Sequence, residues 1–505
     1  MANYLTLAVI LFACIGSWTW GYVAGIIAST LGQPSFSSYM GFNESNTSTL
    51  QGLANALFSV GGFVGCYASV FVNERKGRLA GIFVGCVLDI IGSALSAGAV
   101  HIAMFIVGRF VVGLGVGFLL VLVPLYESEI TPHNKRGLLV GLHGVMLCVG
   151  YVSSNWIGYG FFFVKNTNIN WRLPLAIGGV PACLLAACVF RLPQSPRYLV
   201  QRGDNEGALD VCRRLHYDPA HRESDLYLRE HAQIVQQHAI DQHSPASWAS
   251  MFRIAHYRKR AIIGHTTMFF VQCSGNLVIT NYAPILYGKL GYDANKQLLM
   301  AGAWITMCPF GNLLNAFLLD KVGRRLLLSG GLMGCTMCLV AEAVSVARFQ
   351  QTGSQAASLA AVAFLFIHMF FFCTTQDASS YVYVSEIFPT HIRPKGVAIS
   401  VSGLFLSTLI FVSAAPQGFQ NIGWKYYFVL MFPAFVGSLT EFFFWPETRG
   451  LPLEEIAAKF GDDTAAPLED VMKHGARPTE PHGDDSLAAS NVDLEKARHH
   501  LVEQV

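Results

Sequence analysis

Hydrophobic residues along this chain gather in twelve long blocks, and polar residues separate the blocks. The blocks fall at about 5–31, 50–72, 79–98, 101–123, 137–162, 173–191, 259–288, 298–319, 326–347, 358–384, 395–415 and 426–445. A helix needs about 20 predominantly apolar residues to cross a bilayer, and each block is close to that length. Because only helices or closed barrels satisfy the backbone hydrogen bonds inside lipid, the pattern predicts an all-α membrane protein with twelve transmembrane helices.

Composition points the same way. The chain of 505 residues is 52% hydrophobic and only 13% charged, whereas soluble domains carry about 25% charged residues. The net charge of +2 gives no reason to expect nucleic acid as a partner. The first block starts near Leu5 without a basic leader or a small-residue cleavage site, so we expect a retained span rather than a signal peptide.

Basic residues indicate which side of the membrane each loop faces. Lys and Arg are concentrated in the turns at 74–78 and 321–325 and in the loop 192–258, and they are scarce in the loops 32–49 and 348–357. Because basic loops stay in the cytosol, we expect cytosolic termini and a cytosolic central loop, in a multi-pass protein of the plasma membrane. Asn43 and Asn46 then lie outside, each within a glycosylation sequon.

These observations divide the chain into four parts. They are an N-terminal six-helix half at 1–191, a cytosolic central loop with short helices at 192–258, a C-terminal six-helix half at 259–445 and a cytosolic tail at 446–505. After about residue 462 the tail is rich in Asp, Glu, His, Pro and Ala and poor in large apolar residues. Such a segment buries too little apolar surface to fold, so we expect it to be largely disordered.

Two polar motifs occur once in each half. Glu74–Arg78 recurs as Asp320–Arg324 at an offset of 246, and Tyr126–Arg136 recurs as Tyr383–Arg393 at an offset of 257. The repeat predicts two pseudo-symmetric halves, as in transporters whose halves rock about a site near the membrane midplane.

The charged residues of these motifs lie at the expected cytosolic ends of helices. They are the acids Glu74, Glu129, Asp320 and Glu386 and the arginines Arg78, Arg136, Arg324 and Arg393. We expect Glu74 to pair with Arg136, Glu129 with Arg78, Asp320 with Arg393 and Glu386 with Arg324, each on a neighbouring helix. Such a network would close the cytosolic gate and break when the protein opens inward. The alternative is that the charges only anchor the helix ends among lipid headgroups.

Further motifs occur in order along the chain. They are Gly108-Arg109, Pro193-Gln194-Ser195-Pro196-Arg197, Gly423-Trp424-Lys425-Tyr426-Tyr427 and Pro446-Glu447-Thr448-Arg449-Gly450-Leu451. With the repeated motifs, they resemble the sugar porter family of the major facilitator superfamily, in its fungal branches. The resemblance implies the major facilitator fold, alternating access and a hexose-sized cavity between the halves.

Several positions that contact sugar or carry protons in that family hold other residues here. Val23 stands where the family often has a proton-coupling acid, and Gly144 stands where it has a sugar-binding Gln. By the same resemblance, Cys308 replaces an Asn, Tyr381 replaces a Trp, and Leu404 and Phe405 replace an Asn-Trp pair. The resemblance therefore implies transport but leaves the solute and the proton coupling open.

Six side chains are candidates for binding the solute. They are His143, Gln272, Asn276, Asn281, Asp377 and Tyr381. Gln272 and Asn276 are one helical turn apart and share a helix face, and the resemblance implies that Gln272 faces the cavity. For each polar side chain the alternative is a structural hydrogen bond to a neighbouring helix.

Asp377 is an ionisable residue inside a predicted span, which makes it a functional candidate by default. It precedes Tyr381 by one helical turn, so we expect both side chains to face the cavity. The carboxylate could accept solute hydroxyls, or carry a proton in place of the missing acid. The alternative is an internal pair with His368 or with a residue of the eleventh predicted helix, at 395–415.

The favoured function is a monomeric carrier that moves a sugar or a sugar-like solute by facilitated diffusion. Alternatives are a proton symporter that uses Asp377, a sugar sensor, and a carrier of a polyol, a sugar acid or a secondary metabolite. No nucleophile–base pair or metal constellation is evident in the sequence, so we expect no enzyme activity, no cofactor and no metal. Nearly all of the twelve cysteines lie inside apolar blocks, and we interpret them as packing residues.

Overall fold

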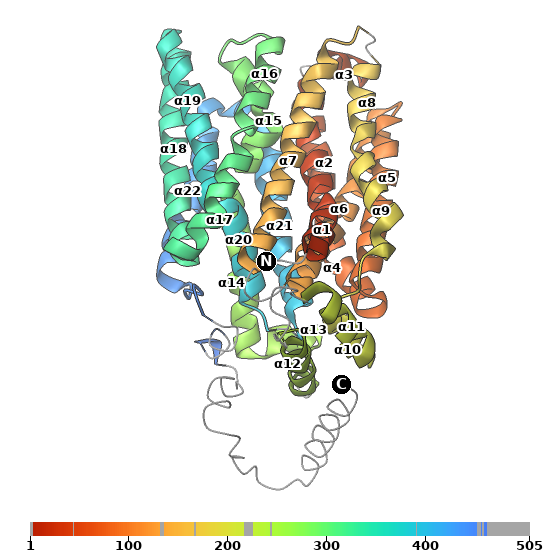
Figure 1. The fold of residues 1–505 in the computed structure, drawn as a ribbon. Helices are drawn as coiled ribbons and strands as arrows, with labels where there is room; N and C mark the ends of the chain where they lie inside the picture. Colours follow the sequence, from red (N-terminus) through yellow and green to blue (C-terminus); the bar gives the residue numbers. More distant parts are fainter. Residues whose placement is uncertain are drawn as a thin grey trace, which may run out of the picture. The chain divides into compact units, whose positions relative to one another are not determined.

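The structure is a computed structural model that describes residues 4–43, 45–131, 136–165, 168–216, 226–242, 245–389, 391–451, 456 and 459–461. Helices make up nearly all of these residues (Figure 1). The tail after 462, for which disorder is predicted, lies outside the described residues.

The helices fall into three groups along the chain. The first group holds α1 Tyr4–Ala13, α2 Ile15–Leu31, α3 Pro34–Tyr39, α4 Thr47–Lys76, α5 Arg78–Ala97, α6 Ile102–Ile130, α7 Arg136–Phe162, α8 Ile169–Ile177, α9 Gly179–Cys188 and η2 Val189–Arg191. The short second group holds α10 Pro196–Gln201, α11 Asn205–His216, α12 Leu226–Asp241 and α13 Trp248–Arg253. The third group holds α14 Ala255–Cys273, α15 Asn276–Lys289, α16 Ala294–Ile305, α17 Cys308–Val322, α18 Arg324–Thr352, α19 Gln355–Phe372, η3 Cys373–Asp377, α20 Ala378–Glu386, α21 Arg393–Asn421, η4 Gly423–Lys425 and α22 Tyr426–Phe444.

Eleven stretches of the described residues are long and apolar enough to cross a membrane. The predicted span at 137–162 coincides with α7, whose first side chains fall outside the described residues. Some helices run further than the hydrophobic blocks; α6 continues to Ile130, although its block ends near 123. Hydropathy marks the part of a helix that lipid surrounds, so it places the helix end too early where the helix continues into the polar interface.

Several spans consist of two pieces joined at membrane depth. α14 and α15 meet at Ser274 and Gly275, and α19 joins α20 through the π-helical turn η3. Gly275 has a φ of +82°, a left-handed conformation that glycine adopts without steric cost. Such breaks are tolerated in a membrane only where the freed polar groups face other protein groups or a solvated site.

Glycines bring helix backbones into direct contact. A Cβ added at Gly21 of α2 would lie 2.0 Å from the carbonyl oxygen of Leu147 in α7. α4 and α6 approach each other through Gly61 and Gly113 in the same way. Because lipid provides no hydrophobic force between helices, this close fit supplies much of their attraction.

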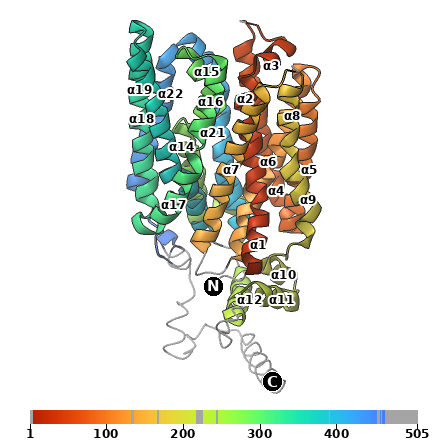
Figure 2. The ribbon, with the colours of Figure 1, turned by 45° about the horizontal axis from the view of Figure 1, so that its top comes forward.

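Contacts also join the two halves. α4 packs on α21, and α7 packs on α16 and α17. Figures 1 and 2 both show α7 between α2 and α17. α7 therefore borders both its own half and the C-terminal half, as α4 also does.

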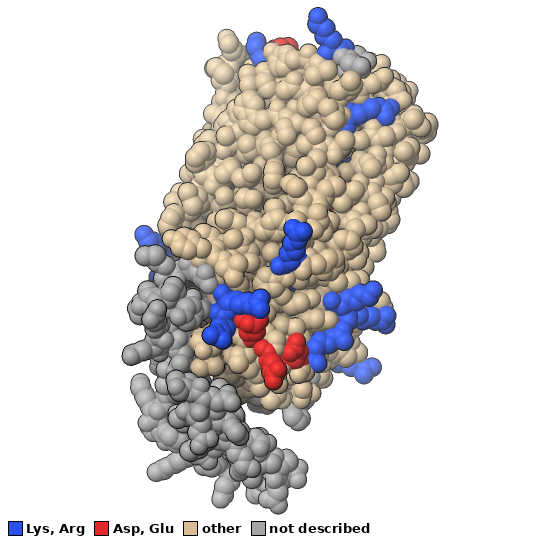
Figure 3. Space-filling view, turned by 45° about the vertical axis from the view of Figure 1, so that its right-hand side comes forward, with Lys and Arg blue, Asp and Glu red and all other residues tan. Residues whose placement is uncertain are grey.

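Charged side chains are distributed unevenly over the surface. In Figure 3 they gather toward the lower end, where Figure 1 draws α10–α13, and a broad surface with few charges lies above. A lipid-facing belt is expected to have this character.

The close approach of α2 and α7 predicts that a larger side chain at Gly150 prevents correct packing. A Cβ there would lie 2.4 Å from the carbonyl oxygen of Trp18. Gly150→Leu should therefore abolish a monodisperse peak in size-exclusion chromatography in detergent. Gly160→Leu, on the same helix, is the control, because no atom lies within 4 Å of its added Cβ. Equal behaviour of the two variants would contradict the packing argument.

Candidate functional site

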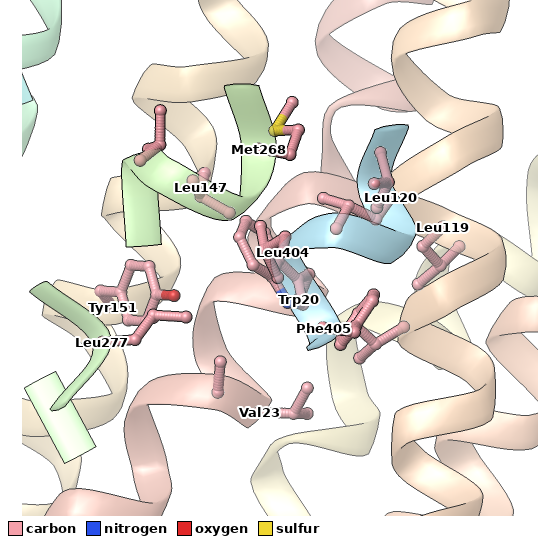
Figure 4. Close-up of a cluster of buried hydrophobic side chains, with 14 of the residues drawn as sticks. Trp20, Val23, Leu119, Leu120, Leu147, Tyr151, Met268, Leu277, Leu404 and Phe405 are labelled. Atoms are coloured by element: carbon pink, nitrogen blue, oxygen red, sulfur yellow. The ribbon is translucent and has the colours of Figure 1, made fainter. Parts of the chain in front are cut away.

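Large apolar side chains from helices of both halves form one buried cluster, the apolar centre (Figure 4). They are buried and include Trp20, Val23, Leu119, Leu120, Leu147, Tyr151, Met268, Leu277, Leu404 and Phe405. Leu404 and Phe405 thus belong to an apolar surface. In the family that the sequence resembles, these two positions hold Asn and Trp.

Aromatic rings join α2, α7 and α20 at this centre. The ring of Trp20 lies 6.1 Å from that of Tyr151 and 6.5 Å from that of Tyr381, between centroids. The His143 ring contacts Tyr381 at 5.6 Å, edge to face. Pockets for small molecules are commonly lined by such rings together with a few polar groups.

The polar candidates of α14 and α15 lie at the break between the two helices. Gln272 and Asn276 are buried, and the side-chain oxygen atoms Gln272 Oε1 and Asn276 Oδ1 have no hydrogen-bond partner. Asn281, one turn further along α15, donates from Nδ2 to the carbonyl oxygen of Leu277 at 2.7 Å. Leu277 belongs to the apolar cluster of Figure 4, so the break borders the apolar centre.

His143 belongs to a buried polar cluster that the sequence analysis did not find. Its Nδ1 is hydrogen-bonded to Ser17 Oγ at 2.7 Å and lies 3.6 Å from Glu127 Oε2. The Cys14 thiol donates to Glu127 Oε1 at 3.1 Å, and His143 Nε2 has no partner. Glu127 was not singled out because it lies inside the repeated motif, although its side chain is fully buried and a buried acid is itself a functional signal.

Asp377 lies at the end of the π-helical turn and contacts the opposite half. Its Oδ2 accepts a hydrogen bond from Asn312 Nδ2 at 2.8 Å, and the Cys148 thiol of α7 lies 3.6 Å away. The pair with His368, weighed as an alternative, is not the observed arrangement, because His368 Nε2 is bonded to the carbonyl oxygen of Ser274 at 2.8 Å.

Arg109 is buried in α6 and faces α2. Its Nη1 donates to the backbone carbonyl oxygen of Val23 at 2.9 Å, and its guanidinium lies 4.3 Å from the centre of the Phe58 ring. The Arg109 guanidinium is thus hydrogen-bonded to a backbone carbonyl, at the position where the family that the sequence resembles often has an acidic side chain.

Two ion pairs lie at the helix ends of the repeated motifs, one in each half. Arg78 donates from Nε and Nη2 to both carboxylate oxygens of Glu129, at 2.9 and 3.0 Å. In the other half, Arg324 Nη2 donates to Glu386 Oε1 at 2.9 Å. These pairings match the acid–arginine partners expected from the sequence.

A third ion pair connects the halves. Glu74 of α4, for which Arg136 was the expected partner, accepts a hydrogen bond from Lys395 of α21. The sequence did not indicate Lys395, because the repeated motif ends at Arg393. Arg393 itself donates from Nε to the carbonyl oxygen of Phe388 at 3.2 Å. The side chains of Arg136 and Asp320 lie outside the described residues.

The two sequon asparagines occupy an exposed turn. Asn43 Oδ1 accepts from the backbone nitrogen atoms of Ser45 and Asn46, and Asn46 Nδ2 donates to the carbonyl oxygen of Gly41. Glycosylation at these positions stays a prediction.

Comparison with known proteins places this architecture in a family. The family model described as "Sugar (and other) transporter" matches residues 9–460. The chain belongs to the sugar porter family of the major facilitator superfamily. The predicted twelve-helix major facilitator fold is thereby confirmed, and the family is one of carriers rather than enzymes.

Three similar proteins illustrate the range of this sugar porter's relatives. The MFS-type transporter criB of Aspergillus cristatus is 32% identical over 92% of this chain and 95% of its own length. The sugar transporter STL1 of Saccharomyces cerevisiae is 28% identical over 96% of this chain and 88% of its own length. The E. coli proton:xylose symporter XylE, solved with 6-bromo-6-deoxy-D-glucose, has a TM-score of 0.79 at 23% identity, covering 91% of this chain and 100% of XylE.

The buried ion pair between Arg78 and Glu129 predicts a large stability effect. Glu129→Gln should lower the free energy of unfolding by about 3–5 kcal/mol, because it leaves a buried guanidinium without its carboxylate. The readout is the apparent melting temperature of the purified sugar porter in detergent. Asp210→Asn is the control, since Asp210 pairs with Arg214 on an exposed face and such pairs contribute about 0–1 kcal/mol. Equal melting temperatures for both variants would refute the assignment.

Proposed function

We propose that this sugar porter moves a sugar or a sugar-like solute across the plasma membrane by alternating access and facilitated diffusion. The observation that supports this best is the pair of unpaired oxygen atoms, Gln272 Oε1 and Asn276 Oδ1, at the break between α14 and α15. A buried acceptor without a donor is unfavourable by about 1–3 kcal/mol. A solute hydroxyl would supply the donor that the protein lacks there.

The apolar centre constrains which solute fits. The ring of Trp20 packs against those of Tyr151 and Tyr381, and the unpaired acceptors are the oxygen atoms of Gln272 and Asn276 at the break between α14 and α15. A solute with hydroxyls on one face and C–H groups on the other would satisfy both surfaces. The names of STL1 and XylE point to sugars, whereas that of criB states no solute. The proposal therefore includes sugars, polyols and sugar derivatives.

Alternating access needs bonds that persist within each half and bonds that break between the halves. Arg78–Glu129 and Arg324–Glu386 each lie inside one half. Glu74–Lys395 connects α4 to α21 across the halves. In the proposed cycle the first two pairs keep each half rigid, and the third opens when the halves separate at this end.

Facilitated diffusion is favoured by the bond between Arg109 and the carbonyl oxygen of Val23. No titratable side chain occupies the Val23 position, so the family's usual proton carrier is lacking. Symport is the second candidate, because two other carboxylates, Glu127 and Asp377, are buried among the candidate site residues. A sensor would bind the solute without moving it.

Replacing Gln272 tests the solute site. Gln272→Ala should raise the KM of uptake about 5- to 150-fold, because it removes a hydrogen bond of about 1–3 kcal/mol to the solute. The measurement is initial uptake of labelled D-glucose, D-xylose and D-sorbitol by transporter-null yeast cells that express the protein. Gln350→Ala, at an exposed position of α18, serves as the control and should behave as wild type. A KM unchanged in Gln272→Ala for the transported solute would make Gln272 structural.

Proton coupling can be tested with a protonophore. Under facilitated diffusion the cellular solute concentration levels off at the external one, and the protonophore leaves initial uptake unchanged. Accumulation above the external concentration that collapses with the protonophore would reject facilitated diffusion. In that case Asp377→Asn and Glu127→Gln identify the carrier of the proton, because only the variant at that carboxylate loses accumulation while retaining downhill exchange.

A further inference from the structure

Three cysteines and one acid converge where the two halves meet. The sulfur of Cys308 lies 2.8 Å from that of Cys148 and 3.0 Å from that of Cys373. The Cys148 sulfur lies 3.6 Å from Asp377 Oδ2. The donor atoms of Cys148, Cys308 and Asp377 all fall within 4.8 Å of one another.

These side chains come from three elements and from both halves. Cys148 belongs to α7 of the N-terminal half, Cys308 begins α17, and Cys373 and Asp377 begin and end the π-helical turn η3. The three cysteines are buried and none forms a disulfide. Asn312, one turn after Cys308, donates to both Cys148 Sγ and Asp377 Oδ2, at 3.0 and 2.8 Å.

We propose that Cys148, Cys308 and Asp377 hold a soft divalent metal ion of the Zn²⁺ class, with the Cys373 thiol, which contacts Cys308, moving in as the fourth ligand. Three sulfur atoms and one carboxylate oxygen make a four-ligand set that suits tetrahedral Zn²⁺. Thiolates select zinc and its soft relatives over Mg²⁺ and Ca²⁺, which take oxygen ligands.

The dimensions of the cluster allow an ion after a small expansion. Zn–S bonds of about 2.3 Å place two sulfur ligands of a tetrahedral ion about 3.8 Å apart. The sulfur atoms would therefore separate by about 1 Å. The π-helical turn that carries Cys373 and Asp377 is a form of helix often found at functional sites, and Asn312 could orient the carboxylate from outside the ligand set.

A metal ion accounts for more of the cluster than its two rivals do. A disulfide would use only two of the three thiols and would leave Asp377 unused. Plain packing leaves one hydrogen bond from Asn312 to offset an ionisable Asp377 beside the Cys148 sulfur, although such a group is costly inside a span. An ion would engage all four groups and neutralise the carboxylate.

The site would regulate transport, a consequence that rests on the proposed function. An ion bound to Cys148 and to Cys308 ties α7 to α17, so the two halves could no longer rock apart. Metal binding can be measured on the purified protein whether or not it transports a solute. Failure of the metal site and failure of the proposed function are therefore distinguishable.

The direct test is Cd²⁺ binding to the purified full chain in detergent. One Cd²⁺ per chain should bind, with thiolate-to-cadmium charge-transfer absorption in the ultraviolet. Cys148→Ser and Cys373→Ser should each weaken the affinity at least about tenfold, since even groups that only support a metal ligand contribute 10- to 100-fold. Cys335→Ser, at a buried cysteine of α18 outside the cluster, should bind as wild type.

Three outcomes would overturn the metal site. They are the absence of stoichiometric Cd²⁺ binding, binding that both cluster variants retain, and binding that Cys335→Ser removes. Size-exclusion profiles check that each variant is folded. Two single variants are used because, if one of them does not fold, Cd²⁺ binding by the other still tests the site.

Transport supplies the second arm, with whichever labelled sugar the chain is found to carry. Cd²⁺ should inhibit uptake in proteoliposomes, and a chelator should reverse the inhibition while the reductant tris(2-carboxyethyl)phosphine should not. Inhibition that the chelator does not reverse would reject the metal. If Cd²⁺ binds but no tested sugar is carried, the proposed function fails and the metal site stands.

Discussion

Direct contact between helix backbones is the constraint on which this structure depends. Water no longer drives helices together inside lipid, so they associate through close packing and a few polar bonds. Gly21 lets α2 lie against α7, and Gly61 and Gly113 do the same for α4 and α6. Each half thereby gains a rigid frame, and the polar side chains on that frame keep fixed positions relative to one another.

The contacts inside each half and the contacts between the halves have different tasks in a carrier. Inside a half, glycine contacts and the buried Arg78–Glu129 pair hold helices at short range. Between the halves, Gly52 of α4 lies against the backbone of Ser413 in α21, and the Glu74–Lys395 pair and the approach of Cys148 to Asp377 add polar contacts. A carrier that alternates between two open states must break contacts between its halves while those inside each half persist, because its halves move as units.

The sequence predicted the spans, the two halves and the partners of Arg78 and Arg324, because hydropathy and repeated motifs are written in consecutive residues. It could not predict the Glu74–Lys395 pair, in which the partners are 321 positions apart. The Cys148–Cys308 contact joins residues 160 positions apart, so no local spacing identified it. Those features are made by tertiary packing, which a single sequence does not display.

In the proposed cycle the halves of this sugar porter carry a solute between the two membrane faces without a proton. Uptake into proteoliposomes under an imposed pH gradient, acid outside, tests this directly: the vesicles receive labelled D-glucose, D-xylose or D-sorbitol, and uptake is followed with and without a protonophore. We expect the label of at least one of these solutes to enter until its internal concentration equals the external one, at an initial rate that the protonophore leaves unchanged. Binding of a solute without entry, or accumulation above the external concentration that the protonophore collapses, would contradict facilitated diffusion.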